Sequence, residues 1–131
     1  MNKLTHATGD HGRRVLVVDD NVALAENIVE LLELVGYVVE IAASAEEALP
    51  KVLTGQVAFI ITDYLLPGLN GAELIKSVRS QGHQVRAVIM SAYSDEGTIR
   101  AATEAGIADF IPKPVDFARL TRLLAVPGSF L

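Results

Sequence analysis

The chain has 131 residues, a length typical of one domain. Half of the residues are hydrophobic, and 11 Lys and Arg against 16 Asp and Glu give a formal net charge of −5, which disfavours binding to nucleic-acid phosphates or anionic membranes. Cysteine is absent, which excludes disulfides, thiol catalysis and Cys-based metal sites. The polar N-terminus, and the lack of an uncharged run near the ~20 residues of a membrane helix, predict a cytoplasmic protein.

Short apolar runs alternate with helical stretches along the chain. In order, we expect a strand at 15–18, a helix at 21–35, a strand at 38–41, a helix from residue 44, a strand at 57–61, a helix at 72–81, a strand at 85–90, a helix at 96–105, a strand at 109–111 and a helix at 116–125. The runs are nearly continuous and rich in β-branched residues, which is typical of parallel strands buried on both faces. Pro50 is expected to kink the second helix or to make it re-form after Ala48.

This pattern predicts an α/β fold with a doubly wound, five-stranded parallel sheet and five helices. Helices on both faces of the sheet also explain why so apolar a chain needs no membrane. We expect one domain over residues 13–126, a flexible N-terminal leader over 1–12 and a C-terminal tail over 127–131.

Polar residues follow the predicted strands at their carboxyl ends, where open α/β sheets bind ligands. They are Asp19 and Asp20 after the first strand, Asp63 after the third, Ser91 after the fourth, and Lys113 with Pro114 after the fifth. Three carboxylates in one cleft repel one another, so one must take a proton or a cation must neutralise them. Oxygen ligands favour Mg²⁺, with Mn²⁺ as an alternative. The charges of the three carboxylates, of Lys113 and of the divalent cation then cancel, and such a neutral site suits phosphoryl transfer. A carboxylate can itself be the nucleophile and form an aspartyl phosphate.

With these motifs the chain resembles the receiver domains of response regulators in two-component signalling. The resemblance rests on Val-Leu-Val-Val-Asp19-Asp20-Asn21, Asp63-Tyr-Leu-Leu-Pro67-Gly-Leu-Asn-Gly71, Met90-Ser91-Ala92-Tyr93 and Gly106-Ile-Ala-Asp-Phe110-Ile-Pro-Lys113-Pro114, and it covers about residues 13–126. It implies the flavodoxin-like (βα)5 receiver fold, a bacterial phosphorelay protein, and a switch that catalyses only its own phosphoryl transfer and dephosphorylation.

The resemblance also implies a role for each matching residue. Asp63 would accept a phosphoryl group from a histidine kinase or a histidine phosphotransfer domain. Asp19, Asp20, Asp63 and the backbone carbonyl of Leu65 would hold the metal. Lys113, before a cis bond to Pro114, and Ser91 would bind the phosphoryl group, and Phe110 would turn inward as Ser91 moves. Phe110 replaces a frequent Tyr, and Leu65 stands where many members have a polar side chain.

Two protein-binding surfaces are expected. Projecting the first helix at 100° per residue predicts a core face of Leu24, Ile28, Leu31, Leu32 and Val35. A neighbouring exposed row of Val22, Ala25 and Val29 would then receive a helix of the phosphodonor. By resemblance, a downstream protein or a second copy would bind the helix 96–105, the strand 109–111 and the helix 116–125, including Arg100, Phe110, Phe117 and Arg119. We expect no direct nucleic-acid or membrane partner.

Two other functions are compatible with the same fold. A flavodoxin-like cofactor-binding module would need a phosphate-cradling loop after the first strand, where Asp19 and Asp20 stand instead. An aspartate-nucleophile phosphatase for small molecules usually carries a second Asp two residues after the nucleophile, as the general acid. That position is Leu65 here, which argues against turnover.

Overall fold

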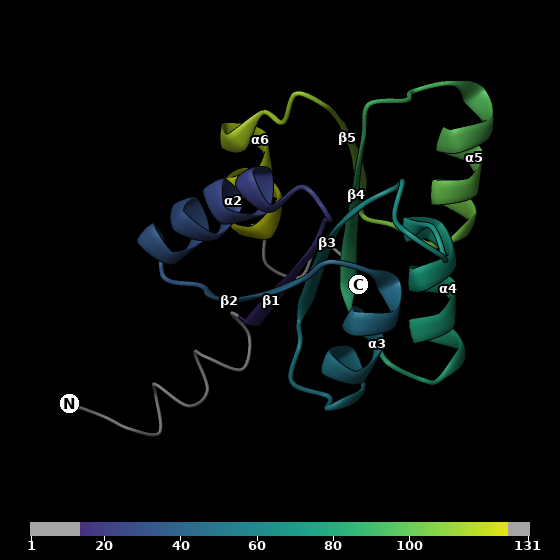
Figure 1. Cartoon of the computed structure of the whole chain (residues 1–131), viewed down its shortest axis with the longest axis horizontal. Helices are drawn as coiled ribbons and strands as arrows, with labels where there is room; N and C mark the ends of the chain where they lie inside the picture. The colour runs from purple at the N-terminus through teal and green to yellow at the C-terminus, as the bar shows by residue number, and fades with distance from the viewer. Residues whose placement is uncertain (1–13, 126–131) are drawn as a thin grey trace.

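The structure is a computed structural model, and it describes residues 14–125. Its elements are β1 (Arg14–Val18), α2 (Val22–Leu34), β2 (Val38–Ala42), α3 (Ala45–Leu53), β3 (Phe59–Asp63), α4 (Gly71–Ser80), β4 (Arg86–Ser91), α5 (Glu96–Glu104), β5 (Asp109–Pro112) and α6 (Phe117–Ala125). The predicted alternation of five strands and five helices is confirmed (Figure 1). The leader expected at 1–12 and the tail expected at 127–131 lie outside the described residues.

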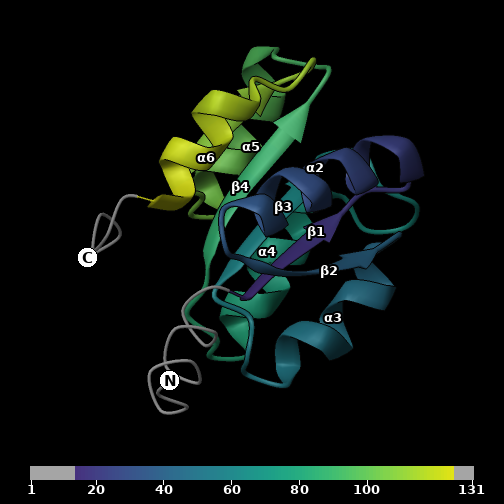
Figure 2. The same cartoon turned by 90° about the vertical axis from the view of Figure 1, so that its left-hand side faces the viewer.

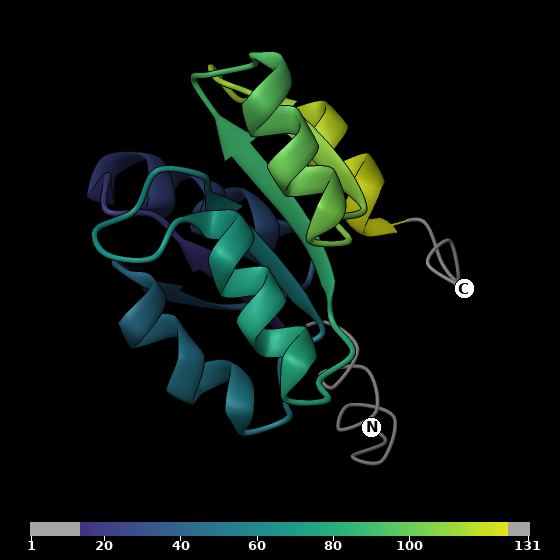
Figure 3. The ribbon, with the colours of Figure 1, turned by 90° about the vertical axis from the view of Figure 1, so that its right-hand side faces the viewer.

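The five strands form one parallel sheet in the order β2-β1-β3-β4-β5. Figure 2 shows α2 and α6 on one face of this sheet, and Figure 3 shows α3, α4 and α5 on the other. The central strand β3 is buried along its whole length, whereas the edge strand β2 is partly exposed. The sheet is therefore covered on both faces, as the continuous apolar runs predict.

Polar caps define where several helices begin. The side chain of Ser44 accepts a hydrogen bond from the Glu47 amide at the start of α3. Asn70 and Glu73 form a complete capping box at the start of α4, each side chain accepting from the other residue's backbone amide at 2.8 Å. This box fixes the first turn of α4 directly after the loop that follows β3.

The second helix, α3, continues through Pro50 to Leu53, so the predicted new start after Ala48 does not occur. Ala45, Ala48 and Val52 form its buried face. Because Val52 lies beyond the proline and still packs in the core, tertiary packing holds this segment in the helix despite the lost donor.

The fourth helix, α5, rests on the sheet through small side chains. Its buried residues are Thr98 and Ala102, with Ala105 at its C-cap. The neighbouring α4, in contrast, buries Leu74, Ile75 and Val78 among others. Arg79 of α4 links the two helices through the end of α5, donating to the carbonyls of Ala105 at 3.2 Å and Gly106 at 2.8 Å.

Candidate functional site

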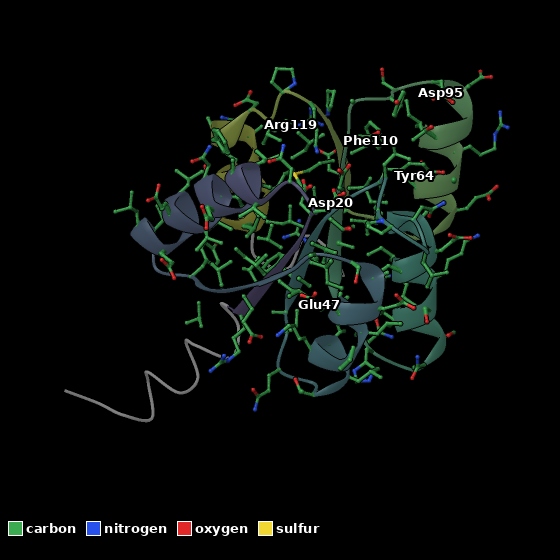
Figure 4. The ribbon with its side chains drawn as sticks, viewed as in Figure 1. Asp20, Glu47, Tyr64, Asp95, Phe110 and Arg119 are labelled. Carbon is green, nitrogen blue, oxygen red and sulfur yellow. The ribbon has the colours of Figure 1, made fainter. Side chains whose placement is uncertain are left out.

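The carboxyl ends of β1, β3, β4 and β5 meet at one edge of the sheet. Asp19 and Asp20 follow β1, Asp63 and Ser91 are the last residues of β3 and β4, and Lys113 follows β5. Figure 4 shows the labelled Asp20 at this edge. The predicted site residues are therefore brought together by the parallel topology, although Asp63 and Ser91 lie within their strands, not after them.

Lys113 joins two of the carboxylates. Its Nζ lies 3.0 Å from Oδ2 of Asp63 and 3.2 Å from Oδ2 of Asp19. Asp19 is 1% exposed and Asp63 is 8% exposed, so both ion pairs are shielded from solvent. Charge-assisted hydrogen bonds of this kind fix the ammonium and both carboxylates in one arrangement.

Backbone amides bind the remaining oxygens of the two carboxylates. Oδ1 of Asp19 accepts from the Asn21 amide at 2.8 Å, and Oδ1 of Asp63 accepts from the Leu65 amide at 3.4 Å. The chain is held at the same place by a bond from the Tyr64 amide to the Met90 carbonyl at 2.8 Å, which extends the β3–β4 pairing by one residue. Both oxygens of Asp63 are thus oriented by the fold.

The electrostatics of the site follow from burial and from the surplus of negative charge. Burial raises the pKa of Asp63 above its ordinary 3.8, and the charge of Asp19 raises it further, while the hydrogen bond from Lys113 opposes the rise. For Lys113, burial alone would lower the pKa, but the hydrogen bond to Asp63 and the charges of Asp63 and Asp19 outweigh it and raise the pKa above 10.5. Lys113 is therefore an ammonium at neutral pH, whereas the ionised form of Asp63 is less favourable than that of a solvent-exposed aspartate.

Comparison with known proteins decides the family. The model of the response regulator receiver domain matches residues 15–125. The chain belongs to the response-regulator receiver family. The receiver domain is 35% identical over 111 residues to the response regulator receiver protein Anae109_2439 of Anaeromyxobacter, covering 85% of this chain and 47% of that protein. It is 33% identical over 101 residues to the response regulator MprA of Mycolicibacterium vanbaalenii, covering 77% of this chain and 44% of that protein.

Solved receiver domains have the same fold. A CheY-like receiver domain protein from Methanospirillum hungatei is 30% identical, with a TM-score of 0.79 over 84% of this chain and 88% of that one. The chemotaxis protein CheY4 of Vibrio cholerae is 27% identical, with a TM-score of 0.79 over 85% of this chain and 94% of that one. The receiver domain spans about half the length of the curated relatives that it matches.

The acidic cluster of the receiver domain fits a divalent cation. Asp19, Asp20 and Asp63 each offer a carboxylate oxygen, and these oxygens lie within 4.8 Å of one another. Asp20 is exposed, so the cluster is open to solvent on that side. Receiver domains bind Mg²⁺ at an acidic pocket, and this all-oxygen donor set, short of positive charge, matches that requirement.

Ser91 and Phe110 occupy the positions that the resemblance assigns to the switch. Ser91 is 1% exposed, and its Oγ accepts from the Tyr93 amide at 2.9 Å. Phe110 is half-buried against the core on the α3–α4–α5 side of the sheet. The Lys113–Pro114 peptide bond is cis.

The predicted docking row on α2 is wrong in part. Val22 is 61% exposed, but Ala25 is fully buried and Val29 is half-buried. Val35, expected in the core, is the C-cap of α2 and is 48% exposed. Relative to the prediction, the buried face of α2 is turned about the helix axis toward Ala25, by about half of the rotation between two consecutive residues. The reason is that α2 packs against α6 as well as against β1 and β2.

On the α5–β5–α6 face, Arg119 bonds within its own chain. Its Nη2 donates to Oδ2 of Asp109 at 2.8 Å and to the carbonyl of Phe110 at 3.0 Å. The sequence placed Arg119 on this face but gave no sign of these bonds. These two bonds link α6 to Asp109 and Phe110 of β5. On this face, α6 and β5 are therefore held together by Arg119.

Sequence reasoning missed two residues that contact the backbone of Asp63. Thr62 looks like one more member of an apolar strand, and Gly71 looks like a turn residue after Asn70. In the structure the Thr62 hydroxyl donates to the Asp63 carbonyl at 2.9 Å, and Gly71 starts α4 directly against that carbonyl. A hydroxyl inside an otherwise apolar run, one residue before a candidate nucleophile, is the signal that was available.

Proposed function

We propose that this receiver domain is a phosphorylation switch in which Asp63 accepts a phosphoryl group from a phosphohistidine of a sensor kinase or phosphotransfer domain. The observation that carries the proposal is the position of the Asp63 carboxylate, buried between the Lys113 ammonium at 3.0 Å and the carboxylates of Asp19 and Asp20. Leu65, two residues on, is apolar and exposed, so the chain lacks the general acid that a phosphatase of this type carries there.

In the proposed reaction an Asp63 oxygen attacks phosphorus and the P–N bond of the phosphohistidine breaks. The imidazole leaves with the electron pair of that bond and takes up a proton from solvent. Asp19, Asp20, Asp63 and the Leu65 carbonyl would hold Mg²⁺, or Mn²⁺ in its place. When bound, the cation supplies positive charge to the phosphoryl oxygens.

The residues of the chain itself do the remaining work. Lys113 is already paired with the Asp63 carboxylate. Once Asp63 carries the phosphoryl group, the same ammonium is placed to pair with the negatively charged phosphoryl oxygens. The Ser91 hydroxyl would donate to a phosphoryl oxygen, drawing the loop after β4 inward. Phe110 would then turn into the vacated space and alter the α5–β5–α6 face that a downstream protein or a second copy binds. A covalent charge thereby shifts a two-state equilibrium.

The proposed partner surface for the phosphodonor is smaller than the sequence suggested. With Ala25 buried, it reduces to Val22, at the end of α2 next to the acidic cluster, and to the exposed part of Val29, about two turns further along the helix. Across the described residues, no helix is long and apolar enough to cross a membrane. We propose that the domain works in the bacterial cytoplasm as part of a two-component pathway.

The test is phosphorylation by acetyl phosphate in the presence of Mg²⁺, followed by intact-protein mass spectrometry. The wild-type chain should gain one phosphate, which hydroxylamine removes because it is an acyl phosphate. Asp63→Asn should gain none. Asp116→Asn is a matched control, because Asp116 accepts from the Arg119 amide at the start of α6, and Asn can do the same. EDTA should abolish the reaction, and either Mg²⁺ or Mn²⁺ should restore it. Unchanged labelling of Asp63→Asn would refute the proposal.

A further inference from the structure

The side chain of Thr62 is a buried hydroxyl that the reaction does not use. Thr62 is 0% exposed, one residue before the phosphoacceptor in the central strand β3. Burying a hydroxyl costs free energy unless it is hydrogen-bonded. Here Oγ1 donates to the backbone carbonyl oxygen of Asp63 at 2.9 Å. The hydroxyl therefore contacts the main chain of the nucleophile itself.

Gly71 approaches the same carbonyl from the side of α4. It is not among the glycines with a positive φ, so its backbone conformation does not require glycine. Space does: a Cβ at this position would collide with the Asp63 carbonyl oxygen and lie 3.2 Å from Cγ2 of Thr62. The Gly71 amide also donates to the Tyr64 carbonyl at 2.8 Å. The first turn of α4 thus packs directly on the backbone at the end of β3.

We propose that Thr62 and Gly71 are positioning residues for phosphoryl acceptance. Between them they hold the Asp63 carbonyl, by a hydrogen bond from Thr62 and by close packing of Gly71. A carbonyl held in this way fixes where the Asp63 side chain emerges, and hence its distances to Lys113 and to the other carboxylates. The inference rests on the proposed function of Asp63 as phosphoacceptor. Displacing a reacting group by about 1 Å can cost on the order of a hundredfold in rate.

The first test replaces the Thr62 hydroxyl without changing the shape of the side chain. Thr62→Val exchanges the hydroxyl for a methyl group, whereas Thr62→Ser keeps the hydroxyl and loses the methyl. The readout is the rate of phosphorylation by acetyl phosphate at saturating Mg²⁺, with urea unfolding measured in parallel. We expect Thr62→Val to be slower by about tenfold, and Thr62→Ser to stay within about twofold of wild type. A role in core packing alone predicts the reverse order, since serine leaves the larger defect.

The second test fills the space beside Asp63. We expect Gly71→Ala to be slower by about tenfold or more, because α4 or the end of β3 must shift. Gly82→Ala is the matched control just beyond the other end of α4. Its φ of +86° strains alanine, but nothing lies within 4 Å of the new Cβ. It should lose stability and still be phosphorylated within about twofold of the wild-type rate.

The outcomes separate this inference from the proposed function. Wild-type rates in Thr62→Val, or equal slowing in Thr62→Val and Thr62→Ser, would overturn the positioning role while leaving Asp63 as phosphoacceptor. If Gly71→Ala does not fold, the Thr62 pair decides alone. A wild-type chain that takes up no phosphate would overturn the proposed function and the positioning role with it.

Discussion

Removing the Lys113 ammonium should destabilise the metal-free receiver domain in a way that depends on pH. In Lys113→Met the stem of the side chain remains, but Asp19 and Asp63 lose the cation that lies 3.2 and 3.0 Å from them. Two largely buried carboxylates and the exposed Asp20 are then left to repel one another. The variant tests whether Lys113 offsets the charge of the acidic cluster.

The size of the effect can be worked from the two distances. At an effective dielectric constant of about 20, a carboxylate and an ammonium about 3 Å apart attract each other by about 5 kcal/mol. Desolvation of both ions offsets much of that gain, and breaking a buried ion pair costs about 3–5 kcal/mol in practice. The Lys113 side chain is 19% exposed, and in the variant protonation of Asp63 relieves part of the repulsion between the carboxylates. We therefore expect a loss of about 3 kcal/mol in the free energy of unfolding near neutral pH.

The pH dependence follows from Asp63. Burial already raises its pKa, and removing Lys113 deletes two influences that hold the pKa down. A raised pKa means that the folded state binds protons more readily than the unfolded state, so stability is present at low pH and is lost as pH rises through the folded-state pKa. The cost of Lys113→Met should therefore be smaller at acidic pH than near neutral pH.

Urea denaturation in EDTA at both pH values measures this, and Lys76→Met, at an exposed position on α4, controls for losing a lysine. Mg²⁺ should restore more stability to Lys113→Met than to the wild type, because the variant cluster carries one more uncompensated negative charge. A loss below about 0.5 kcal/mol near neutral pH, the range of ordinary surface substitutions, would refute the reasoning.

Three other substitutions have expected outcomes. Asp63→Asn should raise the midpoint of urea unfolding in metal-free buffer near neutral pH, because the neutral amide avoids the cost of burying a carboxylate whose pKa is raised; a lower midpoint contradicts this. Arg79→Met should cost about 2 kcal/mol, since Arg79 donates to the carbonyls of Ala105, Gly106 and Val85 at 2.8–3.2 Å, and a cost no larger than that of Lys76→Met would argue against it. Val22→Glu should slow phosphotransfer from a phosphohistidine protein but not from acetyl phosphate, whereas Leu34→Glu, at the far end of α2, should slow neither; equal slowing with both donors would exclude docking at Val22.

The sequence predicted the fold and the position of the site for the same physical reason. In the amino-acid sequence, parallel strands that are buried on both faces are visible as nearly continuous apolar runs. The carboxyl ends of such strands lie at the same edge of the sheet. Once Asp19, Asp63 and Lys113 are assigned to strand ends, their proximity follows without knowledge of side-chain packing. Because β4 lies between β3 and β5, the 3.0 Å distance between Lys113 and Asp63 depends also on the length of the lysine side chain.

Features that depend on close packing were not predictable in this way. The buried face of α2 is set jointly by the sheet and by α6, which is remote in sequence, so projecting the helix alone placed Ala25 on the surface and Val35 in the core. Gly71 has an ordinary backbone conformation, and only the approach of α4 to the Asp63 carbonyl explains it. In the sequence, such a close approach is visible only as a glycine, and this glycine cannot be distinguished from one that a turn requires.

The small side chains beneath α5 set how much free energy its displacement requires. A helix that buries leucine and isoleucine loses about 1.5–3 kcal/mol for each such side chain that leaves the core, whereas an alanine methyl group accounts for about 0.8 kcal/mol. With Thr98, Ala102 and Ala105 beneath it, α5 can move at less cost in buried apolar area than α4, which buries Leu74, Ile75 and Val78. Arg79 holds its C-terminal end through two carbonyls. If α5 is displaced, we therefore expect its other end, which begins at Asp95, four residues after Ser91, to move more than the end that Arg79 holds.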